Sequence, residues 1–298
     1  PRLARIVWSE SDGLPGVVVD RYGDHIVLQT LTLAMYLNRE LIAKVLVDLL
    51  KPESVILRND SPMLAAEGIE EEITIMHGEK PDPFVVEAPT VEGGVKFEID
   101  LLDGQKTGLY LDQLDAHREI AKLAKGKRVL DCFCNQGGFA LACAKAGAAS
   151  VTAVDSSEPA IAAALRNAEL NGVEINAVKH NAFDYLKHCE EQYDIVILDP
   201  PSFTKNKKSL NNAMRGYKEI HLRGLKLLDK DGIMATYCCS HHATRELFLD
   251  NIVSASVDAK KSLRMVASHG QRLDHPVLPA IPETEYLKGF VFQLMPSR

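Results

Sequence analysis

The chain has 298 residues, and its 46% hydrophobic and 25% charged residues are typical of a globular protein with one large domain or two modest ones. No apolar run approaches the ~18–20 residues of a membrane-spanning helix, and no signal segment opens the chain, so we expect a cytoplasmic protein without membrane contact. The net charge of −7 argues against a protein that coats nucleic acid generally. Because Pro1 stands where a Met would open a complete chain, we expect an N-terminal part to be missing.

The cysteine pattern argues against disulfides and against a structural metal site. The six cysteines form no CxxC pair and no metal-spaced set with histidine. His241 and His242 are adjacent, and adjacent histidines cannot easily face one ion. A chain of this size folds without disulfides, so we expect reduced thiols and no bound metal.

The first hundred residues alternate short strand patterns with helical spacing. The predicted elements are strands at 16–20, 25–29, 54–58, 72–76, 84–88 and 95–101 and a helix at 37–50. The turn at 22–24 and the pair Gly93-Gly94 each predict a hairpin between the strands that flank them. We therefore expect a small α+β domain over residues 1–103, on the substrate side of the protein.

Beyond this region, apolar strand patterns alternate regularly with helical ones. The predicted strands are 128–132, 150–155, 177–180, 193–198, 232–237 and 289–295, and the predicted helices are 112–124, 139–146, 159–171, 182–189, 217–228 and 245–256. Continuous apolar strands separated by helices indicate a mostly parallel sheet with helices on both faces. We therefore predict an α/β fold over residues 104–298, a Rossmann-like domain with a seven-stranded sheet.

The turn after the first strand of this domain has the pattern of a cofactor site. The strand ends in Asp131, the turn contains Phe133 and Gly137-Gly138, and the next strand ends in Asp155. Open α/β sheets bind ligands at the carboxyl ends of strands, and an acid after the second strand accepts hydrogen bonds from ribose hydroxyls. A dinucleotide site would carry a glycine where Asp131 stands. The pattern therefore favours S-adenosylmethionine over a dinucleotide as the cofactor.

A polar residue also follows the third predicted strand. Asn181 can accept a hydrogen bond from an adenine amino group through its side-chain carbonyl, and Asp184 can do so instead. The sequence leaves both open.

A stiff, aromatic loop follows the fourth strand. It reads Asp199-Pro200-Pro201-Ser202-Phe203. The two prolines restrict the backbone, so that Asp199 can point at a planar base, and Phe203 can stack on that base for about 1–3 kcal/mol. This pattern predicts a site for a nucleobase.

Two cysteines follow the fifth strand and suggest how a weak nucleophile is activated. A cysteine at the active-site end of a strand can activate a weakly nucleophilic carbon: when a thiolate adds to carbon 6 of cytosine, for example, carbon 5 becomes enamine-like. Cys238 and Cys239 stand there, and successive residues leaving a strand point to opposite sides, so we expect one of them to face the base. Positive charge from His241 or from a nearby basic stretch would help the thiolate form.

Residues 205–230 carry eight Lys/Arg and two Asp/Glu, a local net charge of +6 on an acidic chain. Such a patch fits a selective RNA enzyme, and equally a solvated helix face. The residues expected to bind the substrate are Pro201, Phe203, Lys205, Lys207, Lys208 and Arg215.

These motifs resemble those of the bacterial large-subunit ribosomal RNA cytosine-5 methyltransferases, whose relatives include guanine-N7 enzymes of the same fold. The resemblance runs from about Ser9 to Lys288 and includes the segment Gly104-Gln105-Lys106-Thr107-Gly108 and the turn from Asp131 to Phe139. It implies that Cys239 is the nucleophile and that the Gln-Lys-Thr-Gly segment closes over the cofactor. It also implies an N-terminal PUA domain, which we expect to be absent from the sequence given, in keeping with the missing N-terminal part.

With the resemblance included, the residues expected to bind S-adenosylmethionine are Gln105, Lys106, Thr107, Gly108, Tyr110, Asp131, Phe133, Cys134, Asn135, Gly137, Gly138, Phe139, Asp155, Ser156, Asn181, Ala182, Asp199 and Pro200. Cys239 and Asp199 are the expected catalytic residues, although a bound water could replace Asp199 as the base. The expected partner is large-subunit rRNA, and the oligomeric state stays open, a homodimer included. Two alternatives remain: methylation of a purine ring nitrogen, and binding of the cofactor or RNA without turnover.

Overall fold

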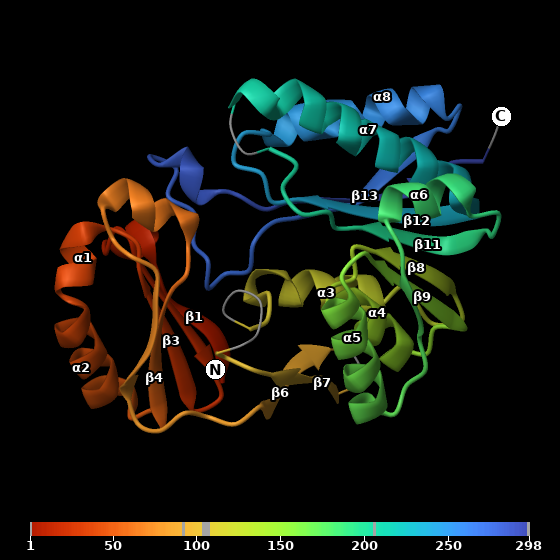
Figure 1. The fold of residues 1–298 in the computed structure, drawn as a ribbon. Coiled ribbons are helices and arrows are strands. Elements are labelled where there is room, and N and C mark those ends of the chain that lie inside the picture. The colour runs from red at the N-terminus through yellow and green to blue at the C-terminus, as the bar shows by residue number, and fades with distance from the viewer. Residues whose placement is uncertain (1, 91–92, 103–107, 205–206, 297–298) are drawn as a thin grey trace. The chain divides into compact units, whose positions relative to one another are not determined.

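The fold is given by a computed structural model, which describes residues 2–90, 93–102, 108–204 and 207–296 (Figure 1). The chain divides into two compact units. Unit 1 comprises Pro1–Ala88, Lys96–Leu114 and Arg272–Thr284, and unit 2 comprises Pro89–Val95, Asp115–Gln271 and Glu285–Arg298. Each unit is built on its own sheet.

Unit 1 contains a five-stranded sheet in the order β1-β2-β3-β4-β5. Its strands and helices are β1 (Leu3–Trp8), β2 (Val17–Tyr22), β3 (His25–Thr30), α1 (Leu33–Leu37), α2 (Arg39–Leu50), β4 (Ser54–Asn59) and β5 (Glu72–His77). The β2–β3 hairpin is antiparallel, as predicted, and β3 and β4 pair in parallel because the two helices connect them. The strands β6 (Phe84–Thr90) and β7 (Gly93–Ile99) form a separate two-stranded sheet.

The helix pair α1–α2 buries only part of its apolar surface. Ala43 and Leu46 are buried against the sheet, whereas Leu37, Leu41 and Leu49 are exposed. On α2, Leu41, the exposed Val45 and Leu49 follow one another at intervals of four residues, so they lie along one side of this helix. The apolar periodicity that predicted the helix therefore describes two faces, and only one of them packs on the core.

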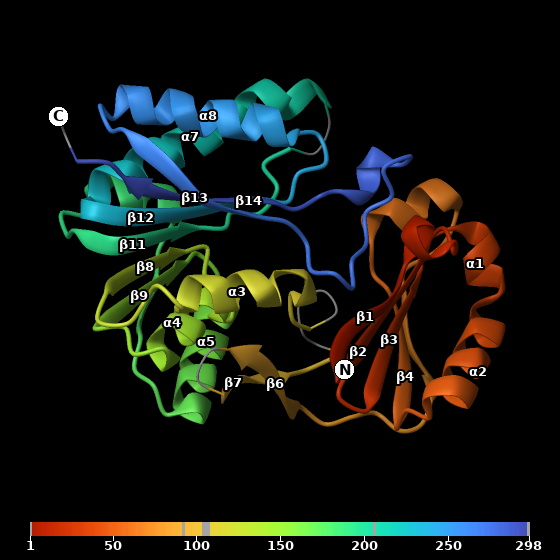
Figure 2. The ribbon, with the colours of Figure 1, turned by 180° about the vertical axis from the view of Figure 1, so that it is seen from behind.

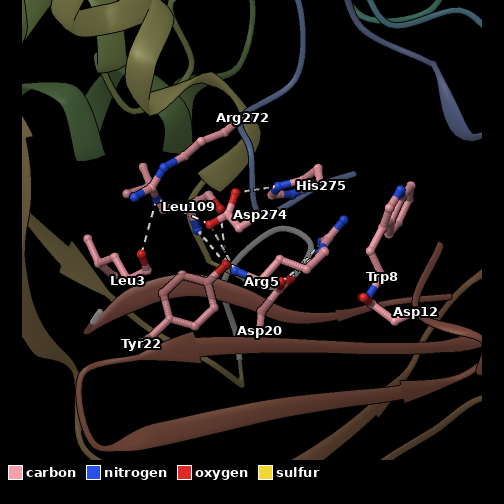
Figure 3. A network of polar contacts seen from close by, with 10 residues as sticks. All are labelled: Leu3, Arg5, Trp8, Asp12, Asp20, Tyr22, Leu109, Arg272, Asp274 and His275. Carbon is pink, nitrogen blue, oxygen red and sulfur yellow. Dashed lines mark hydrogen bonds and ion pairs between the residues drawn. The ribbon is translucent and has the colours of Figure 1, made fainter. Parts of the chain in front are cut away.

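A network of hydrogen bonds and ion pairs connects residues 272–284 to strand β1 within unit 1 (Figure 3). The Asp274 carboxylate accepts a hydrogen bond of 3.2 Å from the backbone N–H of Arg5. Arg272 donates through Nη1 to the carbonyl of Leu3 at 3.1 Å and pairs with Asp274 at 3.3 Å. A segment more than 260 positions away in sequence thereby belongs to the core of unit 1.

Unit 2 contains the predicted α/β fold. Its seven-stranded sheet has the order β10-β9-β8-β11-β12-β14-β13. The strands are β8 (Arg128–Cys132), β9 (Ser150–Asp155), β10 (Asn176–Lys179), β11 (Tyr193–Leu198), β12 (Leu228–Cys238), β13 (Leu263–His269) and β14 (Lys288–Leu294). The first five are parallel to one another, and β14 runs antiparallel to both of its neighbours.

Helices cover both faces of this sheet, as Figure 2 shows from behind. Buried side chains of α3 (Leu114–Ala121), α4 (Gly138–Lys145) and α5 (Glu158–Asn171) pack on one face. Those of α6 (Ala182–His188), α7 (Leu210–Leu227) and α8 (Arg245–Asp258) pack on the other. The prediction of a Rossmann-like domain with helices on both faces is confirmed.

Two strands had no counterpart in the sequence-based prediction. The sequence of β1 does not alternate cleanly because a bulge interrupts its pairing between Arg5 and Val7. The edge strand β13 is largely exposed, so it lacks the apolar run of a central strand. Helix α7 also begins seven residues before its predicted start at 217, in a polar stretch that gave no helical signal.

Candidate functional site

The carboxyl ends of the parallel strands meet at one edge of the unit 2 sheet. Asp131 lies near the end of β8, Asp155 ends β9, Asp199 follows β11 and Cys239 follows β12. The strand order reverses between β8 and β11, where one connection leads to β9 and the other to β12. Such a switch point is where open α/β sheets bind ligands, and the predicted site residues of unit 2 gather along this edge.

The turn after β8 has an unusual backbone. Phe133 and Asn135 have positive φ angles of 66° and 48°, and Gly137 has φ of 91°. The amides of Phe133 and Cys134 both donate to the carbonyl of Val154 on β9, at 2.8 and 3.1 Å. Left-handed conformations cost non-glycine residues energy and persist where the surroundings enforce them, often at functional sites. The fold therefore holds this turn in a defined shape beside β9.

Asp131 is a buried carboxylate that is satisfied on one side only. Its Oδ2 accepts a hydrogen bond from the amide of Ala140 at 3.0 Å, and none of the described residues donates to its Oδ1. Burial, and after it the charge of Asp199, raise the pKa of Asp131 well above the ordinary value of 3.8. A buried acceptor without a donor costs free energy, so the site fits a ligand that brings a donor, above all a cationic one such as the amino group of S-adenosylmethionine.

Asp155 shapes the start of the next connection. Its two oxygens accept hydrogen bonds from the amides of Asn135 and Ser157, at 3.0 and 2.9 Å. Each carboxylate oxygen can accept a second bond, so the side chain can hold this turn and still accept from ribose hydroxyls. Ser156 is exposed beside it.

Asn181 has a structural role that the sequence pattern did not indicate. Its side-chain oxygen accepts from the amides of Phe183 and Asp184, at 2.9 and 3.3 Å, and thereby caps the N-terminus of α6. The neighbouring Ala182 is buried, whereas Asp184 is exposed. The oxygen that was predicted to meet an adenine amino group is thus already engaged by two amides.

The glycine pair of the turn is required by packing. A Cβ on Gly138 would lie 2.5 Å from Cε1 of His117. The His117 ring packs edge-on against Phe139, with 4.4 Å between centroids, and burial lowers the pKa of His117 to about 3. The neutral ring of His117 therefore packs against the glycine pair and Phe139 at the turn after β8, a contact that no sequence motif indicated.

The loop after β11 combines a polar start with an aromatic end. Asp199 donates its amide to the carbonyl of Cys132 at 3.4 Å, Pro200 is buried and Pro201 is exposed. The ring of Phe203 packs on Tyr217, with 4.6 Å between centroids, and belongs to a cluster that includes Phe133 and Phe183. Phe203 is half-buried, so part of the ring is accessible.

Cys238 and Cys239 lie on opposite sides of the chain end, as strand geometry predicts. Cys238 is fully buried in the core beneath α7, and its thiol donates to the hydroxyl of Tyr217 at 3.4 Å. Cys239 packs beside the core on the other sheet face and is partly exposed. Of these two thiols, only that of Cys239 is accessible to a substrate.

Two contacts hold the residue after Cys239. The hydroxyl of Ser240 hydrogen-bonds to that of Thr204, and its carbonyl accepts a 2.6 Å hydrogen bond from Nζ of Lys288. Ser240 and Lys288 are 1% and 3% exposed. No sequence motif indicated that the Lys288 side chain is buried beneath the cysteine segment.

The residues before α3 that were predicted to bind the cofactor belong to unit 1. Gly108 has φ of 126°, and a Cβ there would lie 3.0 Å from Cγ2 of Ile99. The Tyr22 hydroxyl donates to the carbonyl of Leu109 at 3.0 Å, and Tyr110 is exposed. Gln105, Lys106 and Thr107 lie outside the described residues.

The basic stretch is only partly available to a ligand. Lys208 and Arg215 are exposed, whereas Lys218 pairs with Asp258 at 2.7 Å and Arg223 donates to Glu219 at 2.8 Å. Lys205 and the side chain of Lys207 lie outside what the structure describes.

No group of three or more potential metal ligands occurs among the described residues. None of the helices in the described ranges has the length and apolar character needed to span a membrane.

A profile of the S-adenosylmethionine-dependent methyltransferase family matches residues 78–293. Among characterised relatives, the ribosomal RNA large subunit methyltransferase I of Aeromonas hydrophila is 40% identical over 96% of this chain and 73% of its own length. That of Vibrio parahaemolyticus is 40% identical over 98% of this chain and 75% of its own length.

Solved structures agree on the fold. A methyltransferase structure in complex with SAH has a TM-score of 0.84 at 25% identity and covers 98% of this chain and 75% of its own. An S-adenosylmethionine-dependent methyltransferase from Streptococcus mutans has the same TM-score and coverage at 24% identity. The chain belongs to the family of S-adenosylmethionine-dependent methyltransferases that includes these large-subunit enzymes, and S-adenosylmethionine is its cofactor.

Proposed function

We propose that the chain methylates carbon 5 of a cytosine in large-subunit ribosomal RNA, through a covalent adduct between Cys239 and carbon 6. The observation that carries the proposal is the position of Cys239, a partly exposed thiol at the carboxyl end of β12, next to the strand that leads into the Asp199 loop. The names of relatives at about 40% identity support ribosomal RNA as the substrate.

The proposed cofactor site is the edge formed by β8, β9 and the turn after β8. The unsatisfied Oδ1 atom of Asp131 would accept a hydrogen bond from the amino group of S-adenosylmethionine, and Asp155 would accept from the ribose hydroxyls. The remaining residues proposed to line this site from unit 2 are Phe133, Cys134, Asn135, Gly137, Gly138, Phe139, Ser156, Asn181, Ala182, Asp199 and Pro200. When bound, the cofactor supplies an electrophilic methyl group.

In the proposed reaction, Cys239 acts twice. Its thiolate forms a bond to carbon 6 of cytosine, and the electrons of the 5,6 double bond then make carbon 5 nucleophilic. Once carbon 5 has gained the methyl group, with S-adenosylhomocysteine as the other product, the carbon 5 proton passes to a base, the 5,6 double bond forms again and the sulfur departs as thiolate. Cys239 is therefore regenerated at the end of each turnover.

Asp199 is the proposed proton acceptor. It follows β11 directly. After burial, its charge is the next cause that raises the pKa of both Asp131 and Tyr237, which supports a carboxylate near the same edge. Phe203 and Pro201, from the same loop, are proposed to contact the base, and Lys208 and Arg215 the RNA backbone.

The test is transfer of labelled methyl from S-adenosylmethionine to undermodified large-subunit rRNA, with the product base identified. We expect label on cytosine carbon 5 with the wild type, at least a thousandfold less with Cys239→Ala, and near-normal transfer by any Cys238→Ala protein that folds. Label on a purine nitrogen that is insensitive to Cys239→Ala would overturn the proposal and would leave the family assignment intact.

A further inference from the structure

Lys288 is a buried cation beside the proposed nucleophile. It opens β14 and pairs in register with Cys238 on β12. Its side chain extends beneath the next turn, where Nζ donates to the carbonyl of Ser240 at 2.6 Å. Lys288 is 3% exposed, and lysine is rarely buried to this extent without a partner for its charge.

The partner expected of such a charge is missing. Within the part of the chain that the structure describes, the bond to Ser240 is the one hydrogen bond of the Lys288 ammonium, and no carboxylate forms an ion pair with it. Glu285, the nearest acid in sequence, pairs instead with Arg245 at 3.2 Å. An ammonium has three N–H donors. Two donors of Lys288 therefore remain for a negatively charged group that binds or forms during the reaction.

The charged and titratable groups around Lys288 come from the end of β12, the segment before β14, and helices α7 and α8. Burial lowers the pKa of Lys288 and Arg245 adds to this, whereas Cys238, Glu285 and Cys239 raise it. From α7, Tyr217 approaches the same two cysteines, and burial raises its own pKa. Since the charge of an ionised Cys239 favours the charged form of Lys288, the charge of Lys288 must in turn favour the Cys239 thiolate.

We propose that Lys288 is a positioning residue that orients the Cys239–Ser240 segment through the Ser240 carbonyl and stabilises the Cys239 thiolate by its charge. This inference rests on the proposed function, in which the thiolate is needed at the start and released at the end. The Cys238 side chain lies on the opposite side of the strand end, where its thiol donates to the Tyr217 hydroxyl. The accessible thiolate that the charge of Lys288 stabilises is therefore that of Cys239.

The experiment measures the ionisation of Cys239 without RNA and without methyl transfer. Carbamidomethylation by iodoacetamide, followed at the Cys239 peptide by mass spectrometry across pH, reports the thiolate fraction. We expect a wild-type midpoint below the ordinary thiol value of about 8.5, and a midpoint about one pH unit higher in Lys288→Met. At neutral pH the Lys288→Met protein should then react roughly tenfold more slowly.

A second variant separates charge from hydrogen bonding. Lys288→Gln can still donate to Ser240 but carries no charge, so its midpoint should rise as in Lys288→Met. Lys261→Met removes an exposed lysine after α8 and should leave the midpoint unchanged. Circular dichroism and S-adenosylmethionine binding establish that each variant folds, and a titration of Lys288→Gln alone decides the matter if Lys288→Met does not fold.

An unshifted midpoint in folded Lys288→Met or Lys288→Gln would overturn the inference. A wild-type Cys239 that fails to react at any pH would overturn it as well. Both results are independent of where the methyl group is found, so a failure of the proposed substrate chemistry would be recognised separately, by the position of the label on the RNA.

Discussion

Thr204 and Ser240 share a hydrogen bond between their hydroxyl groups, and both side chains are buried. Thr204 belongs to the loop that starts at Asp199, and Ser240 directly follows Cys239. The Thr204 carbonyl also accepts from the hydroxyl of Ser202 at 3.1 Å. The two loops that carry the proposed base and the proposed nucleophile are therefore held together by a contact one residue away from the thiol.

Ser240→Ala removes this contact and should lower kcat about tenfold, because a lost buried hydrogen bond costs about 1 kcal/mol or more and loosens the placement of Cys239. The dissociation constant of S-adenosylmethionine should stay within about twofold, since none of its proposed ligands is touched. Single-turnover kinetics and calorimetry measure the two quantities. Ser256→Ala, which removes a buried hydroxyl bonded within α8, is the matched control and should keep full activity.

Gly138→Ala should destabilise the protein by about 1–3 kcal/mol, because the new Cβ meets the His117 ring at 2.5 Å and that ring is packed on Phe139. In the presence of His117→Ala the same substitution should cost much less, a coupling that urea unfolding of the four proteins measures. Gly216→Ala, in the middle of α7 and in ordinary contact with Phe203 at 3.4 Å, should be neutral or stabilising. Additive effects of the two changes at 117 and 138 would argue against this packing.

Asp131→Asn should stabilise the protein without cofactor at high pH and weaken cofactor binding. The folded pKa of Asp131 is raised above its unfolded value of 3.8, so its contribution to stability is fully present below that value and is lost as pH rises through the folded pKa. The asparagine can still accept from Ala140 but carries no charge, so the difference from wild type should grow as pH rises.

The measurement for Asp131→Asn is urea unfolding without cofactor at about pH 5 and pH 8, with S-adenosylmethionine affinity determined separately. We expect the free energy of unfolding of the variant, relative to that of the wild type, to be higher at the higher pH. The variant should also bind the cofactor at least tenfold more weakly. A constant difference in stability across pH would show that Asp131 ionises normally in the folded protein.

Much of this edge could be predicted from sequence, because strand ends and the residues after them are local features. Asp131 lies one residue before the end of an apolar strand, and Asp155 ends the next one. Cys238 ends a third strand and Cys239 follows it, so their side chains point to opposite sides. In contrast, His117 and Lys288 approach the site from other elements. Their roles depend on packing over long sequence separations, which no local pattern records.

The basic stretch shows a second limit of sequence reasoning. A count of charges treats Lys218 and Arg223 like Arg215, but the first two have carboxylate partners in the structure. The attachment of residues 272–284 to unit 1 was equally invisible in the sequence, because it depends on single polar contacts such as that between Asp274 and the Arg5 amide.

Arg215→Ala should weaken rRNA binding and lower its salt dependence. Arg215 is exposed on α7, and each phosphate contact contributes about 0.7–0.9 to the slope of log affinity against log salt concentration. Filter binding from low to moderate salt should therefore give a slope smaller by roughly that amount. Lys122→Ala, on an exposed lysine after α3 paired with Glu119, is the control, and an equal change in both variants would contradict a specific contact.

The most direct test of the proposed chemistry is to trap the adduct. An undermodified rRNA fragment containing 5-fluorocytidine still allows thiolate addition and methyl transfer, but carbon 5 then carries no proton to lose, so the sulfur cannot depart. With S-adenosylmethionine present, we predict a covalent protein–RNA complex that survives denaturation, with the RNA attached to Cys239 in the digested peptide. Absence of the complex while unsubstituted RNA is still methylated, or attachment at another residue, would contradict the account.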